Sequence, residues 1–301
     1  MKPYVISHMN TSIDGRTWGS RWRPAENRMA GLFERIHEQL GNGSWLIGHV
    51  TGSEYAKEDT YPDHPGEVFP REPWFLRRDA AAYGIALDAH GKIAWGRADI
   101  GGDPIVVILT KQVSDAHLAG LRRDGVSYIF AGERKLDLAL ALEILNRELG
   151  IERLLLEGGG KSNGSFLLAG LIDEISLAVC PAVDGARGGP YAFDSHDDET
   201  DARAPLRSMT LESCGLTIDN LFVGLRPEAP NGGGPSAPFR IPVGVGGKET
   251  APPDLQPDSF GCVPLRFVFG GLLRSLTQIR PRIPVVKPGD QGRRTLPSGL
   301  P

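Results

Sequence analysis

The sequence has little of what marks a secreted, metal-binding or nucleic-acid-binding protein. Its 301 residues include three cysteines, Cys180, Cys214 and Cys262, which lie far apart without C-x-x-C spacing, so neither a disulfide framework nor a zinc site is predicted. No apolar stretch reaches the roughly 18 residues that a membrane helix needs, and the N-terminus lacks a charged segment followed by a long apolar core. A formal net charge of −4 gives no electrostatic reason to expect nucleic acid or an anionic membrane as partner. We therefore expect a cytoplasmic enzyme without a metal ion.

Two standard phosphate-binding motifs are also missing, although a glycine-rich turn is present. The apolar run 154–157 ends in Glu157, and three glycines at 158–160 precede an amphipathic segment. A Walker A loop here would need glycine at Leu155, and a G-x-G-x-x-G motif would need glycine at Asn163. The pattern still predicts a strand, a turn whose N–H groups can approach a phosphate, and a helix N-terminus. It indicates a nucleotide site, and the alternative is a glycine-rich turn that serves only to connect the strand to the helix.

Strand-like and helix-like segments alternate through the first three quarters of the chain. Apolar residues at three- and four-residue spacing predict helices, and short apolar runs predict buried strands. Helices are expected at 24–41 and 138–149, strands at 4–11, 44–50, 104–110, 126–131, 153–157, 175–179, 210–212 and 221–225, and a hairpin at 85–88 and 92–95 around His90-Gly91. Such alternation predicts an α/β fold with a mostly parallel sheet and helices on both faces.

Two segments break this rhythm. Residues 55–79 are rich in proline, acidic and aromatic residues, and a connection of this length is predicted to be either an ordered substrate lid or an idle surface insertion. Fourteen of the 24 prolines lie in residues 227–301, a composition that is typical of disorder. We therefore expect a folded domain at 1–226 and a largely disordered Pro/Gly-rich tail at 227–301.

Several segments together resemble a known enzyme family. They are the strand and S-x-D-G turn at 4–16, the E-G-G-G segment at 157–160, and residues 170–175 with the following Pro181 and Gly185. This set resembles the reductase domain of riboflavin biosynthesis, the C-terminal half of bacterial RibD, which is related to dihydrofolate reductase. The resemblance covers roughly residues 3–226. It implies a three-layer α/β fold of dihydrofolate-reductase type and a homodimer.

The resemblance also implies a reaction. In that family NADPH donates hydride to C1′ of a ribosylaminopyrimidine phosphate and opens the ribose to a ribityl chain; such transfer requires the nicotinamide to be held against the carbon. The chain is accordingly predicted to be a 5-amino-6-(5-phosphoribosylamino)uracil reductase with a small-molecule substrate. Two alternatives stay open at this point. One is a reductase of the same fold that acts on a pterin, imine or enone, and the other is a non-catalytic NADPH-binding module whose tail engages a partner.

Roles for particular residues follow from the same resemblance. Glu157 would accept hydrogen bonds from the pyrimidine's amino groups, as suits a carboxylate facing a donor-rich ring. Asp14 would orient the substrate or relay a proton to the leaving ribose oxygen, and Ser20 would contact the substrate. The NADPH-binding residues would be Thr11, Trp22, Thr51, Gly159, Gly160, Lys161, Ser162, Asn163, Gly164 and Ser165.

The sequence departs from the family in one element. Members that reduce the pyrimidine phosphate carry Asp-Pro-x-Leu-x-x-Arg after the second cofactor loop, and residues 61–71 keep only a proline and Arg71. Arg71 is the expected phosphate ligand, with Arg21, Arg23 and Arg28 as other candidates. His49 is weighed as a catalytic group against a residue that caps a strand. The fused zinc deaminase is not expected, because H-x-E with P-C-x-x-C is missing.

Overall fold

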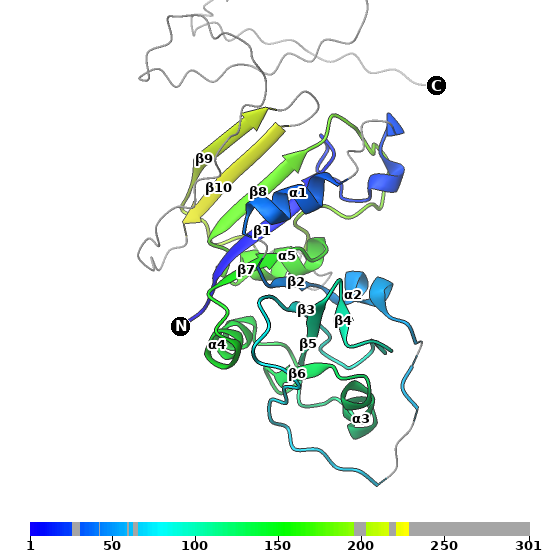
Figure 1. Cartoon of the computed structure of the whole chain (residues 1–301). Coiled ribbons are helices and arrows are strands. Elements are labelled where there is room, and N and C mark those ends of the chain that lie inside the picture. The colour runs from blue at the N-terminus through cyan, green and yellow to red at the C-terminus, as the bar shows by residue number, and fades with distance from the viewer. Residues whose placement is uncertain are drawn as a thin grey trace, which may run out of the picture. The chain divides into compact units, whose positions relative to one another are not determined.

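The computed structural model describes residues 1–25, 31–41, 43–58, 60–62, 66–195, 203–216 and 221–228. The chain divides into two units, Met1–Val245 and Gly246–Pro301, and every described residue belongs to the first unit (Figure 1). The tail that we expect at 227–301 lies outside the described residues from 229 onward. Its boundary after residue 226 stays a prediction.

A ten-stranded sheet runs through the described part of the first unit (Figure 1). Its strands are β1 (Tyr4–Thr11), β2 (Trp45–Ile47), β3 (Gly84–Leu87), β4 (Asp99–Ile100), β5 (Asp103–Leu109), β6 (Ser127–Phe130), β7 (Arg153–Leu156), β8 (Glu174–Val179), β9 (Ser208–Leu216) and β10 (Leu221–Glu228). The order is β4-β5-β3-β2-β7-β1-β8-β10-β9, with β6 also paired to β5. Neighbours from β6 to β8 are parallel, whereas β4, β9 and β10 pair in antiparallel fashion. The predicted mostly parallel sheet is confirmed.

Helices cover both faces of this sheet and give three layers. They are α1 (Leu32–Gln39), α2 (His49–Tyr55), α3 (Asp115–Arg123), α4 (Leu138–Leu149) and α5 (Gly160–Leu168), with a short 3-10 helix at Gly19–Arg21. Ile36 of α1 and Leu118 of α3 belong to the core on one face, and Leu142 of α4 and Phe166 of α5 to the core on the other. Alternate residues of the central strands point to each face, so both faces are apolar.

The elements with the strongest periodicity form as predicted. Helix α4 begins where Asp137 accepts a hydrogen bond from the Leu140 backbone N–H at 2.9 Å, and it ends at Gly150 with φ +66°. A side-chain oxygen at the N-cap and a left-handed glycine at the C-terminus are the usual helix boundaries. For α1, residues 26–30 of the predicted 24–41 helix lie outside the described residues.

One predicted element is wrong. Residues 85–88 and 92–95 do not form a hairpin, because β3 lies between β2 and β5 and is parallel to both. After β3 the chain turns so that the N–H groups of Lys92 and Ile93 donate to the Asp88 carboxylate at 2.7–2.9 Å. Apolar residues alternate on both sides of the His-Gly turn, which is typical of a hairpin. Here the N–H groups of Lys92 and Ile93 bind the Asp88 carboxylate and are not available to pair with a second strand.

The aromatic segment 55–79 lies against α3 and β6. Trp74 and Tyr128 exchange backbone hydrogen bonds at 2.9 and 2.8 Å, and their rings stack 5.8 Å apart. The Tyr61 hydroxyl donates to Asp124 at 2.7 Å. Three strands, β5, β3 and β2, separate β6 from β7, whose carboxyl end carries Glu157. The described residues of the segment pack on α3 and β6 rather than on the end of β7, which favours the surface insertion over the substrate lid.

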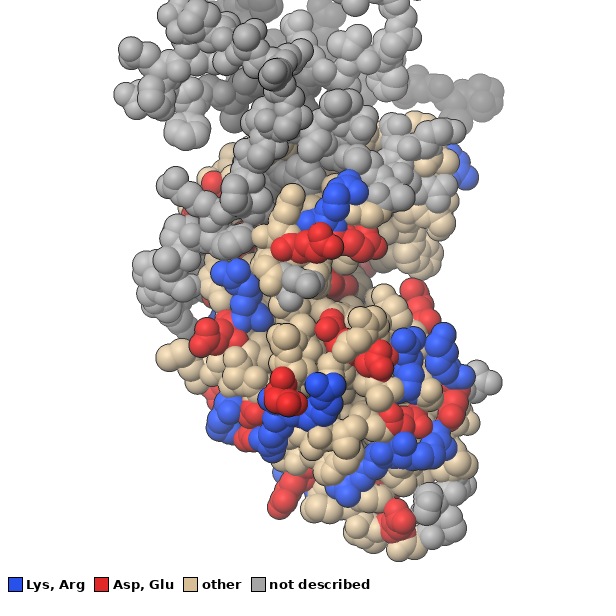
Figure 2. Space-filling model, in the orientation of Figure 1, with Lys and Arg blue, Asp and Glu red and all other residues tan. Residues whose placement is uncertain are grey.

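Charges of both signs are interspersed on the face drawn in Figure 2, where no large area of one sign stands out among the coloured atoms. Within the described ranges, no helix has the length and apolar character to cross a membrane. The same residues contain no cluster of three or more His, Cys, Asp or Glu side chains suited to a metal ion.

Candidate active site

Strands β1, β7 and β2 are parallel neighbours, and β1 continues four residues beyond the end of β7. Ser7 of β1 and Leu46 of β2 are both in register with Leu156, the last residue of β7. Ligands of open α/β sheets bind at the carboxyl ends of the parallel strands. Glu157, directly after β7, therefore lies at the edge where such a fold places its ligand.

Glu157 is paired with a residue that the sequence pattern does not single out. The Glu157 side chain is 7% exposed, and its Oε1 lies 2.8 Å from Nδ1 of His37 on α1. Burial raises the pKa of Glu157, and the hydrogen bond from His37 acts in the opposite direction. One signal could have identified His37: it follows Ile36 on the helix face that packs against the sheet, where a polar side chain needs a partner.

A second histidine lies on β1 under the same helix. His8 is fully buried, its ring stacks on Phe33 with centroids 4.5 Å apart, and its Nε2 lies 3.3 Å from the Phe33 carbonyl oxygen. Burial lowers the pKa of His8 to about 4, so the ring is neutral near pH 7. His8 Nδ1, Asn10 Oδ1 and Trp22 Nε1 are buried atoms for which the described part of the chain offers no hydrogen-bond partner. Such atoms are rare in folded proteins, and three of them gather near β1 and α1.

The glycine turn brings two helix N-termini together. Helix α5 follows Gly159 and α2 follows Gly48, and in the described structure neither has a side-chain N-cap. A Cβ atom on Gly48 would lie 2.1 Å from Ser162 Oγ, and one on Gly159 would have Thr51 Oγ1 as its nearest neighbour at 4.0 Å. Thr51, Gly159 and Ser162 thus lie close together. A nine-residue helix without a side-chain cap has first-turn N–H groups that an anion can accept from, so these residues fit the diphosphate of a dinucleotide.

Part of the predicted cofactor set has another role. Asn163 is fully buried and donates from Nδ2 to the Ala192 carbonyl oxygen at 2.8 Å. A Cβ atom on Gly160 would lie 2.1 Å from the Tyr191 carbonyl oxygen, and one on Gly164 would lie 1.7 Å from that of Asp194. These three residues face the segment 190–194, so we correct their assignment from cofactor contacts to helix packing, apart from the Gly160 N–H in the first turn.

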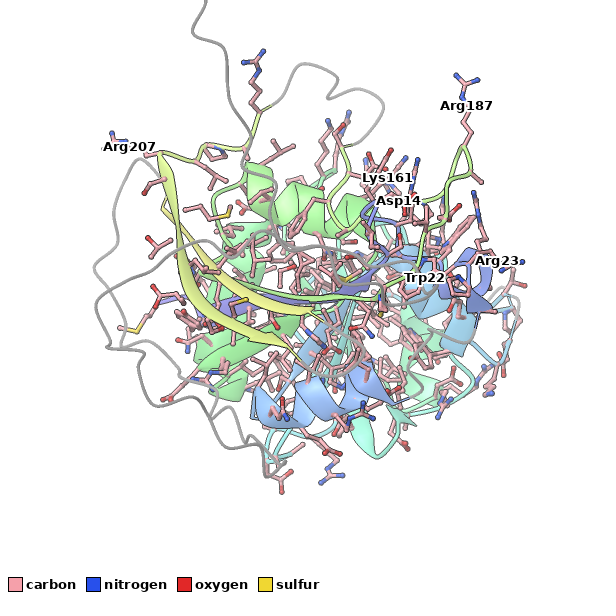
Figure 3. All side chains as sticks on the ribbon, turned by 90° about the horizontal axis from the view of Figure 1, so that it is seen from above. Asp14, Trp22, Arg23, Lys161, Arg187 and Arg207 are labelled. Atoms are coloured by element: carbon pink, nitrogen blue, oxygen red, sulfur yellow. The ribbon has the colours of Figure 1, made fainter. Side chains whose placement is uncertain are left out.

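The remaining residues of the segment are not buried. Lys161 is exposed and Ser162 is half-buried. Ser165 donates its hydroxyl to the Lys161 carbonyl oxygen at 2.9 Å, within the helix itself. In the view of Figure 3, Lys161, Asp14 and Trp22 lie toward one side of the molecule and Arg207 lies at the other. The cofactor contacts of Lys161 and Ser162 stay predictions, and the hydroxyl of Ser165 is occupied by its own helix.

Asp14 holds two loops together. Its carboxylate accepts hydrogen bonds from the Ser12 hydroxyl at 2.6 Å and from the backbone N–H groups of Gly185 and Asp184 at 2.9 and 3.1 Å. Slight burial acts to raise the pKa of Asp14, but these bonds outweigh it and lower the pKa to about 2. A carboxylate that stays ionised near neutral pH is a poor proton donor, so these contacts favour a loop anchor over the predicted proton relay.

The other predicted contacts vary in their surroundings. Thr11, at the end of β1, and Trp22 are both buried, and Trp22 belongs to the core under α1. Ser20 is exposed on the 3-10 helix. Arg71 donates to the Asp115 carboxylate and to the carbonyl oxygens of Phe69, Lys111 and Val113, so its guanidinium anchors the 55–79 segment and its predicted phosphate role is corrected.

His49 is the first residue of α2. Its Nδ1 lies 3.7 Å from an oxygen of the buried Asp88 carboxylate, and its side chain is 44% exposed. The sequence pattern predicts neither α2 nor the contact with Asp88. This position favours a structural role at the start of a helix over catalysis.

The fold is of the dihydrofolate-reductase type, and comparison with known proteins identifies the family. Residues 96–218 match the RibD C-terminal domain. The chain is 37% identical over 208 residues to the 2,5-diamino-6-ribosylamino-4(3H)-pyrimidinone 5′-phosphate reductase of Methanothermobacter thermautotrophicus, which covers 67% of this chain and 89% of that protein. The enzyme of the same name from Aquifex aeolicus is 24% identical over 190 residues. These residues make up 63% of this chain and 81% of the Aquifex enzyme. The chain belongs to the RibD C-terminal domain family and is an oxidoreductase.

Solved structures share the fold. The RibD of Acinetobacter baumannii, form 2, has a TM-score of 0.51 at 22% identity and covers 75% of this chain, which spans 58% of that longer chain. A pyrimidine reductase-like protein from Corynebacterium diphtheriae has a TM-score of 0.55 at 16% identity, over 75% of this chain and 92% of its own. At these identities the likeness shows the fold alone.

Proposed function

We propose that this chain reduces 2,5-diamino-6-ribosylamino-4(3H)-pyrimidinone 5′-phosphate with NADPH. The observation that carries the substrate is the relative of that name, which is 37% identical and covered over 89% of its length. The family resemblance implies the uracil analogue as substrate. The relatives favour the diaminopyrimidinone instead, and the uracil becomes the second candidate.

The chemistry of Glu157 supports this choice. The two candidate substrates differ at ring position 2, where one carries an amino donor and the other a carbonyl acceptor. An ionised carboxylate only accepts hydrogen bonds. A buried Glu157 that faces this position stabilises the amino compound, whereas a facing carbonyl oxygen would leave two acceptors opposed at a buried site.

The cofactor is held by residues of two loops. Thr51, Gly159 and Ser162, which lie close together, and the neighbouring Lys161 would hold the diphosphate of NADPH. The bound nicotinamide supplies a hydride. The chain itself positions the pyrimidine through Glu157 and keeps water out with the apolar residues under α1. The homodimer that the resemblance implies and the cytoplasmic location expected from the composition belong to this proposal, and sedimentation of the purified chain tests the dimer.

The test is turnover with both pyrimidines. Purified protein is mixed with the diaminopyrimidinone or the uracil compound, and loss of NADPH absorbance is followed, with NADH as the cofactor control. The proposal predicts turnover of the diaminopyrimidinone with a higher kcat/KM than the uracil. Equal use of both refutes discrimination at position 2, and no turnover of either, despite NADPH binding, refutes the pyrimidine assignment.

A further inference from the structure

His37 comes from a part of the chain that none of the family motifs touches. It lies on α1, whose apolar residues Leu32 and Ile36 already dock the helix on the sheet. Its Nδ1 nevertheless reaches across to Oε1 of Glu157 at 2.8 Å, and its side chain is 16% exposed. A helix that is docked by apolar contacts does not need this bond for its attachment. We therefore look for the role of this hydrogen bond in the Glu157 carboxylate and not in the docking of α1.

We propose that His37 is the positioning residue for the substrate carboxylate: its Nδ1–H donates to Oε1 of Glu157 and leaves Oε2 to accept from an amino group of the pyrimidine. The inference rests on the proposed function. An ionised carboxylate offers only acceptors, so the ring nitrogen that faces it must carry the proton. This fixes the tautomer of His37 with Nδ1 protonated.

The physical need for such a residue lies in the glutamate itself. The terminal torsion of a glutamate side chain is broad, so an unheld carboxylate turns with little cost. A hydrogen bond to one oxygen removes this freedom before the substrate arrives, and the entropy of ordering is not lost on binding. Both partners come from separate elements, α1 and the end of β7, so the pair is fixed by the fold rather than by local sequence.

The charges around Glu157 determine how pH acts on this arrangement. Besides His37, α1 presents Glu34 and α2 presents Tyr55, and His37 in turn lowers the pKa of His8 on β1. Burial and Glu34 raise the pKa of Glu157, and His37 lowers it. Because a protonated carboxyl group loses an acceptor, substrate binding weakens as pH falls through that pKa. Without His37 the pKa rises further, and binding is lost at a higher pH.

The experiment compares three variants with the wild type. His37→Leu removes the donor, His37→Asn keeps an N–H close to the position of Nδ1, and Gln39→Ala on the exposed face of α1 is the matched control. KM and kcat for the diaminopyrimidinone are measured across pH, and thermal melting and NADPH affinity verify folding. His37→Leu is expected to raise KM about 2- to 10-fold, because the freed Glu157 carboxylate must then be ordered when the substrate binds, with kcat little changed. In His37→Leu, the rise of KM at acidic pH is expected to begin at a higher pH than in the wild type. His37→Asn is expected to restore both the KM and its pH dependence.

Two results overturn the proposal. One is a His37→Leu protein that melts at a lower temperature but keeps the wild-type KM and pH profile, since a purely structural role predicts that. The other is a Glu157 pKa, measured by carboxyl-carbon NMR titration, that is the same with and without His37. If the wild type turns over neither pyrimidine, the proposed function falls. The NMR titration still decides on His37, because it needs no substrate: a raised pKa in His37→Leu supports the pairing and an unchanged one refutes it.

Discussion

Gly164 of α5 lies against the backbone of Asp194, so closely that a Cβ atom on Gly164 would be 1.7 Å from the Asp194 carbonyl oxygen. The Asp194 N–H donates to the Gly160 carbonyl oxygen at 3.0 Å on the same side of the helix. Part of the glycine content of the 158–164 segment is thus required by helix packing and not by a phosphate. Of this segment, the turn before α5 and the side of α5 that faces away from residues 190–194 remain accessible to a cofactor.

Gly164→Ala is predicted to destabilise the fold. A backbone oxygen cannot move aside as a side chain can, so the added methyl group is expected to cost about 3 kcal/mol or more of unfolding free energy, at the upper end for overpacked sites. Gly43→Ala is the matched control, since its Cβ would lie 3.9 Å from the nearest atom, an ordinary contact. Urea denaturation measures both. Similar stability of the two variants would contradict the packing role.

Gly48 and Ser162 are predicted to be coupled in cofactor binding. A Cβ on Gly48 would lie 2.1 Å from Ser162 Oγ but 3.3 Å from Ser162 Cβ. Gly48→Ala must therefore displace the hydroxyl and weaken NADPH binding, and the same change in a Ser162→Ala background must cost less. A double-mutant cycle of NADPH dissociation constants is expected to give a coupling energy of at least about 0.5 kcal/mol, as for residues in contact. Additive effects would show that the two turns act separately.

Asp14 is predicted to matter for acid stability and not for the pH dependence of the reaction. Its folded pKa of about 2 lies below the ordinary value of 3.8, so its contribution is present above pH 4 and lost as pH falls from 4 toward 2. The difference in melting temperature between wild type and Asp14→Asn should shrink across that range. Between pH 5 and 9, kcat is expected to depend on pH in the same way in both proteins. If a pH-dependent change of kcat seen in the wild type were lost in Asp14→Asn, the result would support the proton relay.

The sequence predicts best those elements whose hydrophobic spacing is set by their own residues and not by contacts with distant segments. Helix α4 forms at 138–149, as its spacing predicts, and the order of strand, glycine turn and helix around β7 also holds. Helices α2 and α3 are not predicted, because α2 is short and both carry polar residues among few apolar ones. The hairpin after β3 fails because the Asp88 carboxylate takes the N–H groups that the second strand would need.

The candidate site was predictable in part for the same reason. Glu157, Gly159 and Ser162 belong to one contiguous motif, and the fold places them at the strand edge as expected. His37 lies 120 positions earlier in the chain than Glu157, and only the packing of α1 on the sheet brings the two together. Arg71 fits a phosphate by residue type, but the Asp115 carboxylate and nearby carbonyl oxygens already surround it. Contacts between distant segments decide these roles.

The central claim is that Glu157 binds the pyrimidine, and Glu157→Gln tests it most directly. The substitution keeps size and one acceptor oxygen but replaces the other with a donor, which opposes an amino group. The measurement is kcat/KM for the diaminopyrimidinone beside the dissociation constant of NADPH. The account predicts a fall of kcat/KM of about 10- to 100-fold, the usual loss for a hydrogen bond to a charged group, with NADPH affinity unchanged. Undiminished turnover in Glu157→Gln would contradict it.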